Sequence, residues 1–158
     1  MKANNGTTRN DTQFSVFLAN KPTVLARVCQ QLADDKINIL ALSMMDSTEH
    51  GVLRLVAESP DRARQCLARL NVPTAETTVL LTTLPNRPGA LADIVQRLAN
   101  NHIGVTYAYC TAGAPGGKAL GIFRVSDPQK ATKVLAERQP RRKFEALATR
   151  TSAPARRK

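Results

Sequence analysis

The chain has 158 residues, enough for one ordinary domain or for two small ones. Hydrophobic residues make up 42% of it, and 23 basic residues against 12 acidic ones give a formal net charge of +11. Three cysteines without CxxC spacing argue against a disulfide scaffold, and no apolar run is long enough to cross a bilayer.

The first half of the chain predicts the element order βαββαβ. Residues 1–11 are polar and predict a disordered lead-in without the apolar core of a signal peptide. Alternating apolar residues predict a strand over 13–19, and a helical pattern follows from Val24 to about residue 35. Strands are expected over 37–45 and 52–58. A helix with Ser59 as its N-cap then runs to about residue 70, before a short strand over 72–78.

The second half predicts the same order again. A strand covers 79–84 and a helix 90–101. Strands over 103–110 and 120–126 flank a glycine-rich turn at 112–118. Asp127-Pro128 opens a helix that reaches about residue 137. A last strand is expected within 140–150, around Phe144.

A repeat with a shift of 66 residues relates the two halves, so that Leu18 to Leu25 lines up with Leu84 to Leu91. The sequence predicts an α+β fold of two ferredoxin-like sandwiches, each with two helices on one face of an antiparallel sheet. We expect Ile37, Ile39 and Ala41 to share one face of their strand. The apolar stripes predicted to be buried on the first helix of each half are Leu25, Val28, Cys29 and Leu32, and Leu91, Ile94, Val95 and Leu98.

The turn before the second repeat's first helix has the chemistry of an anion site. Pro88 suits a first helical turn, where a missing N–H is no loss. Gly89 allows a close approach to the backbone, and free N–H groups at a helix start attract a carboxylate or phosphate.

The second half carries the pattern Asn86-Arg87-Pro88-Gly89-Ala90-Leu91, then Ile103-Gly104-Val105 and Asp127-Pro128. These motifs resemble those of the ACT domain family. The first half has Thr23 where the family prefers glycine, but keeps Ile37-Asn38-Ile39. The resemblance covers roughly residues 12–150 and is closest to stand-alone proteins made of two ACT domains. It implies ACT domains at 12–76 and 77–150, outside which the composition predicts a disordered lead at 1–11 and a basic tail at 151–158.

The resemblance also implies an amino-acid ligand held between two paired ACT domains, by the strand-to-helix turn and by the start of the second strand. The ammonium of such a ligand needs oxygen acceptors, which the amides of Asn20, Asn38 or Asn86 offer. The ligand-binding residues carried over in this way are Asn20, Thr23, Val24, Leu25, Asn38 and Ile39 in the first half, and Asn86, Gly89, Ala90, Leu91, Gly104 and Val105 in the second.

Simpler interpretations stand beside this one. Asn20 and Asn86 are also typical turn residues, and Pro22, Pro88 and Gly89 suit a helix start without any ligand. The two halves are not equivalent, so one site could combine both, or only one half could bind.

Other motifs indicate no chemistry. Residues 113–118 miss the phosphate-loop spacing and lead into a strand, which favours a hairpin. His50 and His102 are far apart in the repeat and have no cluster of partners, so neither metal binding nor acid–base catalysis is expected. Tyr107 and Tyr109 alternate on one strand and are expected to line a domain or dimer interface. Cys29 and Cys66 are expected to be small buried hydrophobes in a reducing compartment.

The sequence therefore predicts a non-catalytic, cytoplasmic regulatory protein without a cofactor. Its expected partners are a small amino acid, a second copy of the chain, and a regulated enzyme or transcription partner. An alternative is a dimeric adaptor that contacts nucleic acid or an acidic partner through residues 138–158, which hold eight basic residues against one acidic one. Aromatic residues do not interleave with these charges apart from Phe144, so the stacking platform of single-strand binders is not visible.

Overall fold

The computed structural model describes residues 8–19, 22–45, 50–111, 113 and 116–136. Within these residues the elements, in chain order, are β1 (Thr8–Ala19), α1 (Pro22–Asp34), β2 (Ile39–Met45), β3 (His50–Ala57), α2 (Pro60–Arg69), β4 (Thr74–Pro85), α3 (Ala90–Asn100), β5 (Val105–Cys110), β6 (Lys118–Val125) and α4 (Pro128–Ala136). The predicted tandem α+β fold is confirmed.

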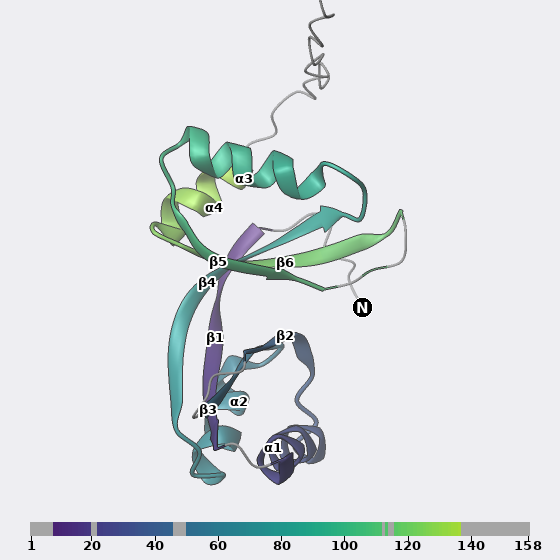
Figure 1. Ribbon diagram of the computed structural model, residues 1–158, viewed down its shortest axis with the longest axis vertical. Helices are drawn as coiled ribbons and strands as arrows, with labels where there is room; N and C mark the ends of the chain where they lie inside the picture. The colour runs from purple at the N-terminus through teal and green to yellow at the C-terminus, as the bar shows by residue number, and fades with distance from the viewer. Residues whose placement is uncertain (1–7, 20–21, 46–49, 112, 114–115, 137–158) are drawn as a thin grey trace, which may run out of the picture.

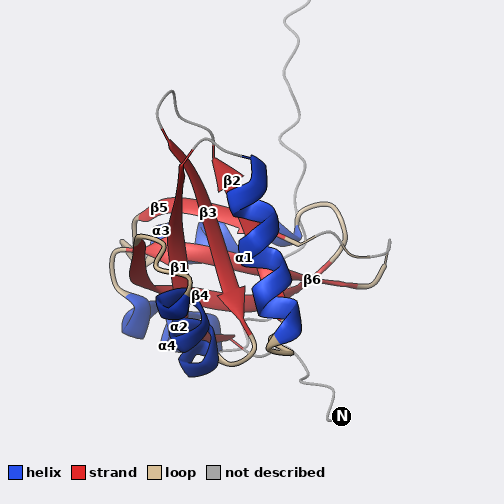
Figure 2. Ribbon diagram, turned by 90° about the horizontal axis from the view of Figure 1, so that it is seen from below, coloured by secondary structure: helices blue, strands red, loops and turns tan. Residues whose placement is uncertain are grey.

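All described strands belong to one antiparallel sheet with the order β2-β3-β1-β4-β6-β5. The first module comprises α1, α2, β2, β3, most of β1 and the start of β4; the second comprises the rest of β4 with α3, α4, β5 and β6. Figure 1 shows the long strands β1 and β4 joining the two halves of a strongly curled sheet. In Figure 2 the helices of the first module lie in front, and the strands of the second module cross behind those of the first.

The repeat is visible in the strand register. Between Ile39 and Ala41 the β2–β3 register shifts by one residue, and the β5–β6 register shifts at the equivalent place, between Val105 and Tyr107. Such a bulge turns the following residues to the opposite face of the sheet. The prediction that Ile37, Ile39 and Ala41 share a face is therefore wrong, because Ala41 packs on the other side.

Strands β1 and β4 are longer than the sequence predicts, because each serves both modules. Thr8 to Asp11 pair with Thr82 to Val79, so these four residues are strand rather than disordered lead-in. The strands predicted over 72–78 and 79–84 form one continuous strand, and the expected domain boundary at 76/77 falls inside it. The strand predicted within 140–150 lies outside the described residues.

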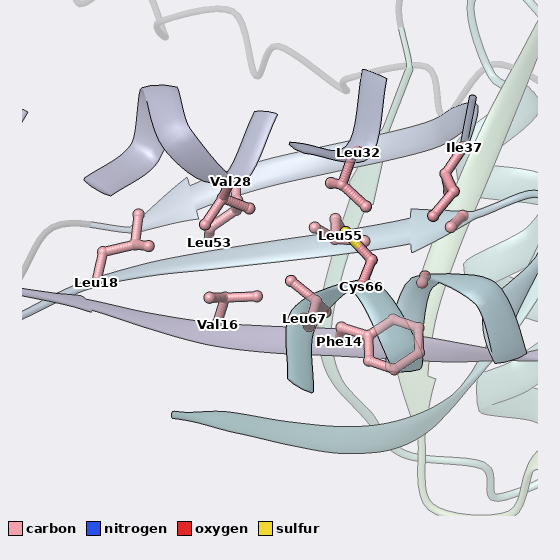
Figure 3. Packing of buried hydrophobic residues seen from close by; sticks show 12 residues of the cluster. Phe14, Val16, Leu18, Val28, Leu32, Ile37, Leu53, Leu55, Cys66 and Leu67 are labelled. Atoms are coloured by element: carbon pink, nitrogen blue, oxygen red, sulfur yellow. The ribbon is translucent and has the colours of Figure 1, made fainter. Parts of the chain in front are cut away.

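Each module has its own core between its helices and the sheet. Figure 3 shows Phe14, Val16 and Leu55 of the first module beneath Val28 and Leu32 of α1 and beside Leu67 of α2. The second core gathers the equivalent residues around Leu80, Leu98 and Phe123. The predicted stripes are only half buried, because Cys29, Leu91 and Val95 face solvent.

A third core joins the two modules on the helix-free face, the side of the sheet that carries no helix. Its buried residues come from both halves, and they are Ala41, Val56, Val79, Leu81 and Ile122. The curl of the sheet therefore packs one module's helix-free face against the other's, which fixes how the modules sit.

A polar cluster lies beside this third core. The amide nitrogen of Gln13, a fully buried residue, donates to the hydroxyl of Tyr107 at 2.8 Å, and the hydroxyl of Tyr109 donates to its amide oxygen at 3.0 Å. The guanidinium of Arg54 stacks on the Tyr107 ring, 3.9 Å from its centroid. Burial raises the pKa of Tyr109, and the neighbouring Tyr107 raises it further, so the Tyr109 hydroxyl stays a neutral donor. The prediction that these tyrosines line a domain interface is confirmed.

The second helix of each module begins differently. Ser59 occupies the N-cap position of α2, as predicted, but its side chain makes no capping hydrogen bond. At the equivalent position before α4, the carboxylate of Asp127 accepts a hydrogen bond of 2.9 Å from the Lys130 N–H. The second module therefore has the better helix start.

Candidate functional site

The turn between β4 and α3 presents the best-defined part of the predicted site. Gly89 is exposed and has a φ of 85°, a left-handed conformation that glycine adopts at little cost. Ala90 is buried in the second core, so only its backbone faces the turn, whereas the Leu91 side chain is 45% exposed. The ion pair between Arg87 and Asp93, at 3.2 Å, spans this helix start.

Asn86 holds the same turn to the β5–β6 hairpin. Its side-chain nitrogen donates to the Gly113 carbonyl at 2.7 Å. Its backbone N–H donates to Gly117, and its carbonyl accepts from the Gly116 N–H. The amide thus bonds to a neighbouring loop rather than to its own turn, and this positions the start of α3.

The equivalent turn of the first module is only partly described, since Asn20 lies outside the described residues. Thr23 is exposed in the first turn of α1. Val24 and Leu25 are half-buried and pack against the first core. Their side chains therefore help to anchor the helix start.

The starts of the second strands are built alike in the two modules. The Asn38 carbonyl accepts a hydrogen bond of 2.9 Å from the Glu58 N–H, and the Gly104 carbonyl accepts one of 2.9 Å from Ser126. Gly104 also donates its N–H to the Ser126 hydroxyl at 3.0 Å. Ile39 packs against the first core, whereas Val105 is 36% exposed.

The first helix of each module separates these two groups of predicted residues. α1 has 13 residues and α3 has 11, which corresponds to roughly 20 and 16 Å at about 1.5 Å per residue. The turn stands at one end of the helix and the strand start follows the other end. A module therefore cannot close a site around a small ligand from its own two groups.

Sequence reasoning missed an exposed apolar surface on the second module. Leu91 and Val95 on α3 and Val105 on β5 are 36–45% exposed. They were predicted to complete the apolar stripe or the strand pattern. The helical pattern does not reveal this exposure, because an apolar stripe does not show which of its edges meets the sheet.

A hollow of about 340 Å³ between the end of α1 and one face of α2 was also not foreseen. Its lining residues are Asp34, Asp35, Lys36, Ile37, Arg62, Gln65 and Arg69. Asp35 is central here, because its carboxylate pairs with Arg69 and its carbonyl accepts from Arg62. Burial, with a hydrogen bond to Asp35, raises the pKa of Cys66 to about 11. These contacts make the hollow a charged helix–helix junction.

In the part of the chain that the structure describes, no three His, Cys, Asp or Glu residues lie close enough to hold a metal ion. Nor is any described helix both long and apolar enough to span a membrane. The predicted site residues present backbone groups, amides and apolar side chains instead of such clusters.

Comparison with known proteins tests the family resemblance. Residues 10–146 match the family model described as an ACT domain pair. The chain belongs to the ACT domain family. A search of curated proteins finds no match.

Several solved structures share this fold. Protein BT0572 from Bacteroides thetaiotaomicron is 31% identical, with a TM-score of 0.75 over 82% of this chain and 88% of that one. The ligand-free regulatory subunit of aspartate kinase from Thermus thermophilus is 13% identical, with a TM-score of 0.60 over 85% and 97%. Aspartokinase III of E. coli, in complex with lysine and aspartate, is 17% identical, with a TM-score of 0.50 over 85% and 33%.

Substituting Gly89 tests the geometry of the ACT turn. A Cβ at this position would meet only the Arg87 guanidinium, at 3.8 Å, so no clash is expected. Because the backbone is left-handed there, Gly89→Ala should lower the free energy of unfolding by about 1–2 kcal/mol. Urea unfolding measures this. Gly104→Ala is the control, since its Cβ would lie 3.8 Å from the Ser126 hydroxyl and its φ is not positive. Equal losses in the two variants would contradict the strain argument.

Proposed function

We propose that this chain is a non-catalytic regulatory protein that binds a small amino acid between paired ACT domains. The observation that carries the proposal is the separation of the two predicted groups by the length of α1 or α3. A ligand that contacts both a turn and a strand start needs two domains, arranged so that the turn of one faces the strand start of the other.

The exposed apolar surface of α3 and β5 supports pairing with a second copy. Leu91 belongs to the turn group and Val105 to the strand-start group, and Val95 lies between them on α3. If two copies pair about a two-fold axis on this surface, their α3 helices run antiparallel. The turn of one protomer then meets the strand start of its partner. Because of the two-fold axis, the dimer contains two such sites.

The chemistry of these groups suits an amino acid. Its carboxylate is attracted to the positive end of a helix dipole at Gly89–Leu91 or at Thr23–Leu25. Its ammonium needs oxygen acceptors, which the amides of Asn20 and Asn38 supply. Regulatory subunits and an amino-acid complex among the solved structures that share this fold support the same ligand class. The free thiols Cys29, Cys66 and Cys110 fit a protein of the reducing cytoplasm.

Calorimetric titration with the twenty amino acids tests the proposal. We expect saturable binding of one or a few of them. Leu91→Gln should abolish this binding and should also convert the dimer to a monomer in sedimentation experiments, because it places an amide in the apolar contact. Leu42→Gln is the matched control. Leu42 is 55% exposed on β2, away from α3, so its change should leave both properties intact.

Two results would count against the proposal. Absence of binding by every amino acid would remove the sensor function. Binding by a monomeric Leu91→Gln variant with unchanged affinity would show that one chain completes the site alone. Asn20→Ala and Asn86→Ala then separate the modules, since the variant that loses binding identifies the module whose turn holds the ligand.

A further inference from the structure

The helix-free face of the first module forms three rows across strands β1, β3 and β2. The strand register defines them as Gln13–Val56–Ala41, Ser15–Arg54–Ser43 and Phe17–Val52–Met45. Successive rows lie roughly 7 Å apart, because side chains on one face recur every second residue. The first row is buried against the second module, and the other two rows extend beyond it. We call these two rows the ledge.

The middle row centres on a guanidinium that is held in place. Arg54 is half-buried, and the ring of Tyr107 covers one face of its guanidinium at 3.9 Å. No carboxylate among the described residues pairs with Arg54. Stacking fixes the plane of the guanidinium, so its N–H edge is oriented for a planar, two-oxygen acceptor.

The neighbours of Arg54 suit an anion. Ser15 and Ser43 are its register partners on the two adjacent strands, and both are half-buried. Side chains directly opposite each other on neighbouring strands lie about 5 Å apart, so two hydroxyls flank the guanidinium. The ledge itself contains no acidic residue that would compete for the guanidinium or attract an ammonium.

The outer row provides an apolar floor. Phe17 is 40% exposed and Met45 is 47% exposed, with Val52 between them. A molecule whose carboxylate reaches Arg54 would lay an aliphatic tail of a few carbons along this row. Burying that tail is favourable, at about 25 cal/mol per Å² of apolar surface.

The second module lacks this arrangement at the equivalent positions. Ile122 stands in the place of Arg54, and Thr83 and Thr111 stand in the places of Phe17 and Met45. Ile122 is fully buried in the third core. Since the two modules share one fold, the ledge is not required to form an ACT domain, and its residues are free to serve a ligand.

We propose that the ledge is a second ligand site, which binds a small carboxylate with an aliphatic tail and no ammonium group. The carboxylate pairs with Arg54 and accepts hydrogen bonds from Ser15 and Ser43, while the tail lies on Phe17, Val52 and Met45. Carboxylates of this class include short branched-chain fatty acids and 2-oxo acids. The site is on the opposite face of the sheet from the helices and is separate from the amino-acid site.

Titration of the full chain with 4-methylpentanoate tests this site. The two tyrosines, Tyr107 and Tyr109, both belong to the cluster beside Arg54, and the chain has no tryptophan. Tyrosine emission therefore reports on the ledge directly, and calorimetry supplies the affinity. We expect saturable binding, and a loss of at least about tenfold in Arg54→Gln, the change that about 1.4 kcal/mol produces.

Controls separate a specific site from general attraction to a basic protein. Arg27→Gln removes an exposed charge on α1 and should titrate like the unaltered chain. Met45→Gln keeps Arg54 and should weaken 4-methylpentanoate more than acetate, which has no tail to lose. Leucine, which adds an ammonium, should bind the ledge more weakly than 4-methylpentanoate.

Several outcomes would overturn the proposal: no saturable binding, equal losses in Arg27→Gln and Arg54→Gln, or leucine binding that depends on Arg54 and matches that of the acid. Binding of a peptide C-terminus in place of the small acid, with the same dependence on Arg54, would overturn the ligand class. Amino-acid binding that is unchanged in Arg54→Gln would be assigned to the site between paired ACT domains. The ledge and the amino-acid site can therefore be disproved independently of each other.

Discussion

Phe14→Ala should lower the free energy of unfolding of the entire chain by about 3–5 kcal/mol, the usual cost of removing a buried aromatic ring. Phe14 has no exposed surface and lies in the first core between β1 and α2. The truncation leaves a cavity among Val16, Leu55 and Leu67 that the sheet cannot close. Urea unfolding followed by far-ultraviolet circular dichroism measures the change.

The same variant also tests whether the modules unfold together. Strands β1 and β4 pair along nine residues without a bulge and take part in both modules, and the third core contains residues from both halves. Loss of one module would therefore expose the helix-free face of the other. Tyrosine emission reports on Tyr107 and Tyr109 in the second module. We expect the unfolding midpoint measured by this emission to fall together with the midpoint measured by circular dichroism.

Phe17→Ala is the matched control for Phe14→Ala. Phe17 is three residues further along β1, on the opposite face, and is 40% exposed, so its truncation should cost much less. If Phe14→Ala split the transition in two, with the tyrosine midpoint unchanged, the modules would be independent folding units and the shared strands would carry little coupling.

The sequence was sufficient to predict the repeated fold because its local signals agree. The helix starts, the apolar periodicity and the shift of 66 residues all indicate the same βαββαβ order in each half. The structure confirms the four helices and the strands β2, β3, β5 and β6 within a few residues, whereas β1 and β4 are longer than predicted. The shift of 66 residues makes Leu98 equivalent to Leu32, and Ile94 equivalent to Val28. All four side chains are buried in the structure, as the helical periodicity predicts.

Long-range pairing could not be predicted in the same way. Thr8 to Asp11 are polar and carry no strand pattern, yet they find partners in Val79 to Thr82. Backbone hydrogen bonds to an open strand edge do not require apolar side chains, so the sequence gives no sign of them. Likewise, the bulge after Ile39 that sends Ala41 to the other face depends on strand register, which local propensity does not determine.

The candidate site was predicted in part for a related reason. The turn at Gly89 follows from residue chemistry, and its left-handed backbone agrees with that chemistry. The binding role of the twelve residues remains a prediction, because it depends on how domains pair. The exposure of Cys29, Leu91 and Val95 is the feature that a single-helix pattern could not reveal, since an apolar stripe does not say which of its edges meets the sheet.

Gln13→Leu should destabilise the contact between the modules, although leucine is more apolar than glutamine. The fully buried amide of Gln13 holds the hydroxyls of Tyr107 and Tyr109 at 2.8 and 3.0 Å. Replacing it leaves two hydroxyls without their partner, and each unsatisfied buried group costs about 1–3 kcal/mol. Because both tyrosines are half-buried, we expect a total loss at the lower end, about 2 kcal/mol.

A double-mutant comparison separates this polar effect from packing. In a background with Tyr107→Phe and Tyr109→Phe, Gln13→Leu leaves no tyrosine hydroxyl unpaired and removes only the long hydrogen bond of 3.4 Å to the Ser15 hydroxyl. Its cost should therefore fall close to zero. Circular dichroism during urea unfolding follows the unaltered chain and the three variants of this cycle, and Gln30→Leu on the exposed side of α1 is the surface control. An equal cost of Gln13→Leu in both backgrounds would mean that Gln13 contributes through its shape alone. The contact between the modules would then depend on the packing of the third core. The hydrogen bonds of the polar cluster would contribute nothing measurable to it.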